Sequence, residues 1–415
     1  MPNGQDEDDY DEIPADASNP LTEEKVELGK YLFHETGIAT AGTNDNFEET
    51  WSCATCHNYQ AGFKSGLVQA IGMGGEGFGV AGEGRRLNSS FDAESGNPRF
   101  VPDVQFRSTP SLLNVAYQDV MFWDGRFGNA SGGPNASVDS RRVVTSEAPL
   151  SVNGNGYKGV EARAVAGWDM HGFEVTGNSV VQEEGRYREL FRDAYPSSSD
   201  VKRDTALAVA AYLRTLLPYN APFQQWVRGS RGEMTDTQKR GAILFFGKAG
   251  CIDCHQGPAL SSQVGASENE MFFSIGFNDM DVSRSDVTGD EDQVEEFELG
   301  RGGFTGDSND NYKYKVPQLY NLRDAAVYGH GGSFTTIRDV VEYKNAAQKQ
   351  NSDARNIADD FDPLRLTRTE INDLVEFLTD GLHDATLVER IPANTLPSGF
   401  CFPNNDDQSK SDLGC

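Results

Sequence analysis

The stretches "CATCH" (53–57) and "CIDCH" (251–255) repeat one pattern and use four of the six cysteines in this 415-residue chain. Two cysteines three positions apart, followed at once by histidine, form the attachment signal of a c-type haem. The thiols can bond to the vinyl groups of one haem, and the histidine can ligate its iron. A redox dithiol normally occurs once, and a zinc site needs its paired motifs closer together than these. We therefore predict two covalently bound haems c.

Length and motif spacing predict how the chain is divided. A chain of 415 residues is long for one hydrophobic core, so two domains with one haem each are expected. The expected divisions are a disordered acidic lead-in (1–20), an N-terminal haem domain (21–225), a C-terminal haem domain (226–395) and a polar tail (396–415). The residues expected to hold the haems are Cys53, Cys56, His57, Cys251, Cys254 and His255.

Helical patterns dominate the sequence between the motifs. The segment "VKRDTALAVAAYLRTLLP" (201–218) places leucine and alanine on one stripe and stops at proline. Two further segments, 235–250 and 366–382, contain a threonine followed three residues later by glutamine or glutamate, which is typical of a capping box. "LGKYLF" (28–33) and "GAILFF" (241–246) form a weak repeat ahead of the two haem motifs. The predicted fold class is mostly α, with two cytochrome c-like domains.

The two ends of the sequence bear on its compartment. Haem c is attached outside the cytoplasm, and the acidic start does not read as a signal peptide, so a removed leader is expected. Cys401 and Cys415 flank a polar tail and can form a disulfide in an oxidising compartment. These features predict a periplasmic or otherwise extracytoplasmic protein.

Charge and hydropathy restrict the classes of partner. The formal net charge of −28 argues against nucleic acid, because two polyanions repel each other. An acidic surface can instead steer a basic electron-donor protein. No apolar run approaches the length of a membrane span, so none is expected.

Several segments in order carry a resemblance to a known family. They are "LGKYLF" (28–33), "SCATCH" (52–57), "STPSLLNVAYQDVMFWDGR" (108–126), "YRELFRDAYP" (187–196), "LFFGKAGCIDCHQGPAL" (244–260), "YKVPQLYNLRDAAVYGHGGSFTTIRDVVEY" (314–343) and "LTRTEINDLVEFL" (366–378). Through them the chain resembles the bacterial di-haem cytochrome c peroxidases, a family that includes MauG-like enzymes. "FWDGR" and the second haem block are the most specific of these segments.

The resemblance implies a division of labour between the two haems. The N-terminal haem is expected to react with peroxide, and the C-terminal haem to take in electrons. Trp123 matches the family's tryptophan that lies between the haems and relays electrons. A calcium ion at the domain interface is also implied, with Ser108, Ala325 and Val327 at its ligand positions, although the family has asparagine where Ser108 stands.

Peroxide cleavage needs a group that moves a proton from one oxygen to the other. The family uses a glutamate at a fixed distance before the "YRELF" helix, and the same count back from Tyr187 reaches Asp169. Asp169 is therefore the expected acid–base group, with Glu174 as the nearest alternative. His171 stands two residues beyond Asp169 and is expected to line the same pocket or to bind the iron.

The loop after the first haem motif departs from typical members of the family. Those members carry a histidine there, which caps the first iron until the other haem is reduced, whereas residues 58–170 contain no histidine. An N-terminal haem that is open in the oxidised protein is expected, as in the MauG-like branch. The alternative is a cap supplied by His171 or Met73.

The sixth ligand of the C-terminal haem is expected on the segment after "YGHGG". The family has methionine or tyrosine fourteen residues after the histidine, and this count from His330 reaches Lys344. A shift of one residue makes Tyr343 the ligand. Tyr343 is slightly preferred, and both residues remain candidates for the iron.

Three functions follow from these expectations. The first is a peroxidase that reduces hydrogen peroxide to water with electrons from a small c-type cytochrome or cupredoxin. The second is a MauG-like enzyme that uses peroxide to oxidise tryptophan or tyrosine residues of a partner protein. The third is a di-haem electron-transfer cytochrome without catalysis, against which "FWDGR" argues. A homodimer is compatible with the family.

Overall fold

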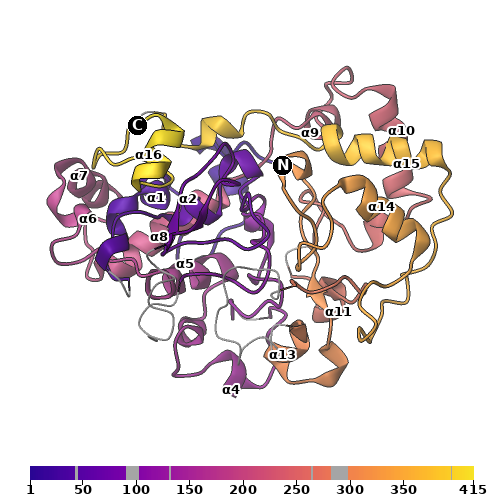
Figure 1. The fold of residues 1–415 in the computed structure, drawn as a ribbon, viewed down its shortest axis with the longest axis horizontal. Helices are drawn as coiled ribbons and strands as arrows, with labels where there is room; N and C mark the ends of the chain where they lie inside the picture. The colour runs from indigo at the N-terminus through magenta and orange to yellow at the C-terminus, as the bar shows by residue number, and fades with distance from the viewer. Residues whose placement is uncertain (43–44, 90–101, 130–131, 263–264, 282–297, 394) are drawn as a thin grey trace.

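The computed structural model describes residues 1–42, 45–89, 102–129, 132–262, 265–281, 298–393 and 395–415. It is mostly helical, as expected, and long loops join the helices (Figure 1). The helices are α1 (Glu23–His34), α2 (Cys53–Cys56), α4 (Ser140–Val143), α5 (Gly159–Met170), α6 (Val180–Glu183), α7 (Gly185–Ala194), α8 (Val201–Arg214), α9 (Pro222–Val227), α10 (Asp236–Phe246), α11 (Glu268–Met271), α13 (Arg301–Thr305), α14 (Ile337–Ala346), α15 (Arg368–Glu376) and α16 (Asp407–Leu413). The strands are β1 (Gly75–Glu76), β2 (Arg86–Leu87), β3 (Phe272–Phe273) and β4 (Tyr314–Lys315), which form the antiparallel pairs β1–β2 and β3–β4. Within the described ranges, no helix is both long enough and apolar enough to cross a membrane.

The N-terminal half is built around helices α1, α5 and α8. Leu32 and Phe33 of α1 belong to its core and are almost fully buried. A β-carbon added at Gly29 would lie 1.9 Å from the carbonyl oxygen of Ala208 in α8. Only glycine permits such a close approach, so this position sets how α1 packs on α8.

The C-terminal half repeats this arrangement with α10 and α15. Its separate core includes Phe245, Leu374 and Phe377. A β-carbon added at Gly241 of α10 would lie 2.1 Å from the carbonyl oxygen of Asp373 in α15. Gly241 therefore corresponds to Gly29, which shifts the repeat by one residue from the alignment of "LGKYLF" with "GAILFF".

The expected starts of α10 and α15 agree with the structure, whereas the expected end of α8 does not. Thr235 caps α10 and Thr367 caps α15, each in a capping box. α15 continues as a short π-helix over Phe377–Gly381. α8 is shorter than its pattern suggested, because it ends at Arg214, before Pro218.

The lead-in over residues 1–20 differs from the disordered segment that its acidic composition suggested. Most of its carboxylates face solvent, but Asp16 is buried, and Tyr10 and Ile13 are buried in a small cluster with Leu217. The guanidinium of Arg214 donates a hydrogen bond of 2.9 Å to the carbonyl of Pro14. Two apolar anchors and a buried donor thus order a segment that composition alone assigns to disorder.

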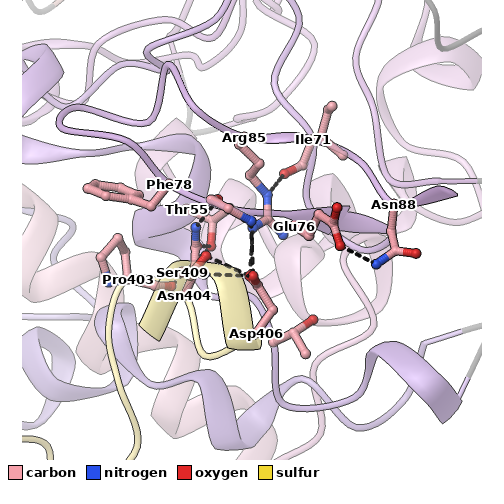
Figure 2. Close-up of polar contacts among 12 residues, drawn as sticks. Thr55, Ile71, Glu76, Phe78, Arg85, Asn88, Pro403, Asn404, Asp406 and Ser409 are labelled. Carbon is pink, nitrogen blue, oxygen red and sulfur yellow. Dashed lines mark hydrogen bonds and ion pairs between the residues drawn. The ribbon is translucent and has the colours of Figure 1, made fainter. Parts of the chain in front are cut away.

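The C-terminal tail crosses back to the N-terminal half, where α16 lies near α1 and α2 (Figure 1). Cys401 and Cys415 form the disulfide that their positions suggested. The carboxylate of Asp406 accepts a hydrogen bond from the Gly77 amide at 2.9 Å and pairs with the buried guanidinium of Arg85 at 3.3 Å (Figure 2). The tail is therefore part of the N-terminal domain.

Candidate haem-binding sites and the junction between them

The first haem motif forms α2, and the C-terminal tail holds the start of this helix. The Ser52 hydroxyl donates to the carbonyl of Pro403 at 2.8 Å. The Thr55 hydroxyl lies 2.5 Å from Oδ1 of Asn404, and both side chains are buried (Figure 2). These contacts fix α2 and, through it, the position of His57 at its C-terminal end.

His57 has the geometry of an iron ligand. Its Nδ1 lies 3.2 Å from the carbonyl of Phe63, and a carbonyl can only accept, so Nδ1 carries the proton. Nε2 is then left with its lone pair for a metal. Burial lowers the pKa of His57 to about 3, so the imidazole is neutral, as ligation requires.

His255 repeats this arrangement in the C-terminal half. Its Nδ1 lies 3.0 Å from the carbonyl of Leu260, which again leaves Nε2 as the free lone pair. Burial lowers the pKa of His255 to about 4. Beside it is a mainly apolar cavity lined by Cys251, Cys254, Phe245 and Val340, among others.

The four motif cysteines suit thioether formation better than metal or redox chemistry. Burial raises the pKa of the Cys53 and Cys56 thiols to about 12 and that of Cys251 to about 11. They are free in the structure, and each pair lies beside its histidine. Protonated thiols in apolar surroundings, next to a neutral imidazole, fit the demands of a covalently attached haem c at both motifs.

The "FWDGR" segment is held by a buried ion cluster. Asp124 is fully buried and pairs with Arg107 and Arg126, each at 2.8 Å. Burial alone would raise the pKa of Asp124, but the two guanidinium groups hold it well below its usual range. Phe122 adopts a φ of 73°, in the left-handed region, and this turn aims the next side chain, Trp123, at the other domain.

Trp123 lies at the junction between the two halves. Its indole Nε1–H donates to the carbonyl of Ser108 at 2.8 Å. The Ser108 amide in turn donates to the carbonyl of His330, in the C-terminal half, at 2.7 Å. Trp123, His330 and His255 all line the same cavity. The tryptophan singled out in the sequence therefore borders the C-terminal haem site.

Asp169, the expected acid–base group, does not lie in a pocket. It stands in the last turn of α5 with its side chain 70% exposed, and it pairs with Lys202 on the surface. The alternative, Glu174, accepts hydrogen bonds from Val175 and Thr176 of its own turn. This placement does not suit the acid–base role predicted for Asp169, because the end of α5 directs this side chain to solvent.

His171 is the predicted residue that does reach the first haem motif. Its Nδ1 lies 2.6 Å from the carboxylate of Asp103, and its Nε2 lies 2.6 Å from a guanidinium nitrogen of Arg163. The carboxylate fixes the proton on Nδ1, so Nε2 accepts from Arg163. Besides burial, the guanidinium of Arg163 acts on the pKa values of Cys53, Cys56 and His57, so the cluster lies beside the first haem motif.

Arg163 and Asp103 were missed in the sequence. Arg163 lies on the inner side of α5, and its guanidinium stacks over the ring of Phe122 at 5.0 Å. Asp103 comes from the loop before "FWDGR", where no periodic pattern marks it. An arginine facing inward among the apolar residues of α5 is the one signal that the sequence offered.

Lys344 and Tyr343, the two candidates for the sixth ligand of the C-terminal haem, point in different directions. Lys344 lines the cavity beside His255, and burial lowers the pKa of its ammonium, which favours the neutral amine that ligation needs. Tyr343 turns away, because its hydroxyl donates to the carbonyl of Ile275. The geometry therefore favours Lys344 over Tyr343, and the identity of the sixth ligand remains a prediction.

The calcium positions are not free for a metal. The Nζ of Lys64 donates to the carbonyl of Val327 at 2.8 Å, and the Ser108 hydroxyl donates to the carbonyl of Gly329 at 2.7 Å. Among the described residues, no cluster of three or more His, Cys, Asp or Glu could hold a metal ion. Of the expected ligands Ser108, Ala325 and Val327, the carbonyl of Val327 thus already binds a cationic group and the hydroxyl of Ser108 is engaged with another carbonyl, so these positions do not fit calcium as they stand.

Comparison with known proteins agrees with two haem-binding motifs in this chain. The sequence model described as "Di-haem cytochrome c peroxidase" matches residues 23–232. The chain is 29% identical over 390 residues to the methylamine utilization protein MauG of Methylorubrum extorquens, with 93% of this chain and 84% of that protein covered. It is 24% identical over 406 residues to the cytochrome-c peroxidase IdrP1 of Pseudomonas sp. strain SCT, with 94% and 88% covered.

Solved structures show the same fold. A MauG-like protein associated with microbial copper homeostasis matches with a TM-score of 0.56 and 21% identity, covering 90% of this chain and 94% of that one. The diheme peroxidase BthA of Burkholderia thailandensis E264 matches with a TM-score of 0.52 and 18% identity, covering 92% and 90%.

Proposed function

Because the chain belongs to the di-haem cytochrome c peroxidase family, we propose that it is a di-haem peroxidase that reduces hydrogen peroxide to water. The reaction takes up two electrons and two protons and breaks the O–O bond, so that one peroxide gives two water molecules. A small c-type cytochrome or cupredoxin supplies the electrons. The tail disulfide and the c-type haem motifs support an extracytoplasmic location.

The observation that carries this proposal is the cluster of His171, Arg163 and Asp103 beside His57. A haem at His57 would supply the iron to which peroxide binds. Asp103 orients the ring of His171 and leaves the lone pair on Nε2, which accepts a hydrogen bond from Arg163. When peroxide replaces Arg163 as the partner of Nε2, this atom would take the proton from one peroxide oxygen and deliver it to the other. The fixed positive charge of Arg163 stabilises negative charge on the departing oxygen.

The C-terminal half serves the electron supply in this proposal. Lys344 would hold the C-terminal haem together with His255, since it is the only lining residue of α14 whose side chain can ligate iron; the others are Ile337, Val340 and Val341. Trp123 relays electrons from this site toward the N-terminal one. Its indole hydrogen bond to Ser108 keeps the ring fixed during transfer.

A second function, MauG-like oxidation of tryptophan or tyrosine residues on a partner protein, is favoured by one observation. Residues 58–170 contain no histidine, so the loop after the first haem motif has no imidazole with which to cap the first iron. Peroxide could then react before any electron arrives, and the oxidising equivalents would be drawn from a protein substrate.

Adding hydrogen peroxide to the oxidised holoprotein, with and without a reduced cytochrome c, tests the proposal. A peroxidase turns over the cytochrome and forms water, whereas a MauG-like enzyme changes its haem spectrum without a donor and does not turn over. His171→Gln should slow the peroxide reaction by about 10²–10⁴-fold. Asp169→Asn, the matched surface control, should change the rate less than about twofold. Equal rates in wild type and His171→Gln would contradict the assignment.

A further inference from the structure

Two buried lysines cross the junction between the halves in opposite directions. Lys64, from the turn after the first haem motif, donates to the carbonyl of Val327 in the C-terminal half at 2.8 Å. Lys315 of β4, in the C-terminal half, donates through Nζ to the side chain of Gln118 in the N-terminal half. Both side chains also line the cavity that contains Trp123. Each half therefore extends a lysine side chain into the other.

The side chain of Lys64 reaches one of the positions at which the family resemblance predicts a calcium ligand. Val327 is the carbonyl expected to ligate calcium, and the ammonium of Lys64 already binds it. A calcium ion on the same oxygen would sit within a few ångströms of that ammonium in a poorly solvated junction, where like charges repel strongly. The described residues also provide no cluster of carboxylates that could offset the charges of a calcium ion and the Lys64 ammonium together.

We propose that the Lys64 ammonium is the built-in cation of this junction, and that it joins the two haem domains where a bound calcium would otherwise do so. The inference goes beyond the proposed reaction, because it concerns how the domains are held together whatever they oxidise or reduce.

The surroundings of Lys64 make it a positioning residue as well as a link. It follows Phe63, whose carbonyl fixes the proton on Nδ1 of His57. Its own carbonyl accepts from the Asn58 amide at 2.9 Å, which closes the turn after the motif. On the other side, Val327 lies three residues before His330, whose carbonyl accepts from Ser108. The ammonium thus connects the turn that orients the first iron ligand to the segment that borders Trp123.

The first test is the metal content of the holoprotein. Calcium per protein is measured by mass spectrometry, before and after dialysis against a calcium chelator, together with Tm and both haem reduction potentials. The proposal expects no stoichiometric calcium and no change in Tm or potentials on chelation. One calcium per chain, whose removal lowers Tm or shifts a potential, would overturn it.

The second test replaces the cation. Lys64→Met removes the charge and keeps the length, and it should lower Tm by at least about 2 °C and shift the potential of the N-terminal haem. Lys64→Arg should restore both values in part. Lys239→Met, on the surface of α10, is the matched control and should leave both unchanged. Addition of calcium should raise the Tm of Lys64→Ala, in which the carbonyl is freed, but not that of wild type.

These outcomes separate the alternatives. A Lys64→Met protein with wild-type Tm and potentials would overturn the proposal even if no calcium were found. If that variant did not fold, the chelation result on wild type would still decide the question. Failure of the proposed peroxidase reaction would leave both tests unaffected, since neither measures turnover.

Discussion

The indole of Trp123 stands edge-on to the imidazole of His330, with ring centroids 6.2 Å apart and planes inclined by 70°. His330 is itself stacked on Tyr314, with centroids 3.6 Å apart. An aromatic path therefore leads from the "FWDGR" turn into the C-terminal half. An indole placed between two redox sites can carry an electron or a hole, and its packing keeps the distance constant.

Replacement of Trp123 by phenylalanine should slow electron transfer between the two haems by at least about tenfold, because a phenyl ring is harder to oxidise and has no N–H for Ser108. The rate is measured by reducing the C-terminal haem and following reoxidation by peroxide. Trp226→Phe, on α9, is the control and should behave like wild type. Equal rates in all three proteins would contradict a relay at Trp123.

Lys344→Ala should change the absorption spectrum of the oxidised C-terminal haem and its reduction potential, because the side chain that lines the cavity beside His255 is lost. Tyr343→Phe should leave both unaltered, since the tyrosine hydroxyl donates to the Ile275 carbonyl. The two variants are compared by absorption spectroscopy and redox titration. A spectral change confined to Tyr343→Phe would assign the ligand to the tyrosine.

Removal of the tail disulfide should loosen the segment that it closes. The loop between Cys401 and Cys415 spans 14 residues, and closing a loop of that size stabilises the folded state by about 3 kcal/mol. In a Cys401→Ser, Cys415→Ser double variant, the amides of Gly77 and Phe78, which donate to Asp406 and Asp412, should exchange with deuterium faster. Unchanged exchange there would show that the tail stays bound without the bridge.

Asp406→Asn should destabilise the N-terminal half by roughly 3 kcal/mol near neutral pH, because it leaves the buried Arg85 charge without its partner. Burial alone would raise the pKa of Asp406, but hydrogen bonds from Gly77 and Ser409 and the charge of Arg85 lower it below its usual 3.8. A carboxylate with a lowered pKa stabilises the fold above pH 3.8, and that contribution is lost as the pH falls through the folded-state pKa.

The difference between wild type and Asp406→Asn should therefore be constant from pH 7 down to about pH 4 and then shrink. Denaturant unfolding at a series of pH values measures it. Asp407→Asn, with a fully exposed carboxylate on the same helix, serves as the control and should show no such dependence. A difference that grew on acidification would have the wrong sign for an ionised Asp406.

The features that short sequence patterns predicted are those that depend on a few neighbouring residues. The haem motifs need only five contiguous residues, and the capping boxes of α10 and α15 need only a threonine and its partner three positions on. The mostly helical fold class followed from such patterns, and the family match bears out the resemblance that the ordered motifs suggested. The role of Trp123 remains a prediction, although its position bordering the C-terminal site agrees with it.

Counting along the chain is sensitive to a single residue: the count from His330 reached Lys344, and the one-residue shift to Tyr343 is the step that the geometry disfavours. A step of one position on an α-helix turns the side chain by about 100°, so Lys344 faces the cavity while Tyr343 faces away from it. Asp169 lies in the last turn of α5, whereas His171 follows the helix, beside Gly172 with its φ of 65°. Contacts between distant segments, such as Asp103 with His171 or Lys64 with Val327, leave no periodic signal at all.

The hydrogen bonds from Ser52 and Thr55 to Pro403 and Asn404 set an order of assembly. The first haem-binding helix is held by residues that are translated more than 340 positions after it. The N-terminal domain therefore cannot complete these contacts until residues 403 and 404 have been synthesised. The Cys401–Cys415 disulfide then fixes the tail that holds the first haem-binding helix.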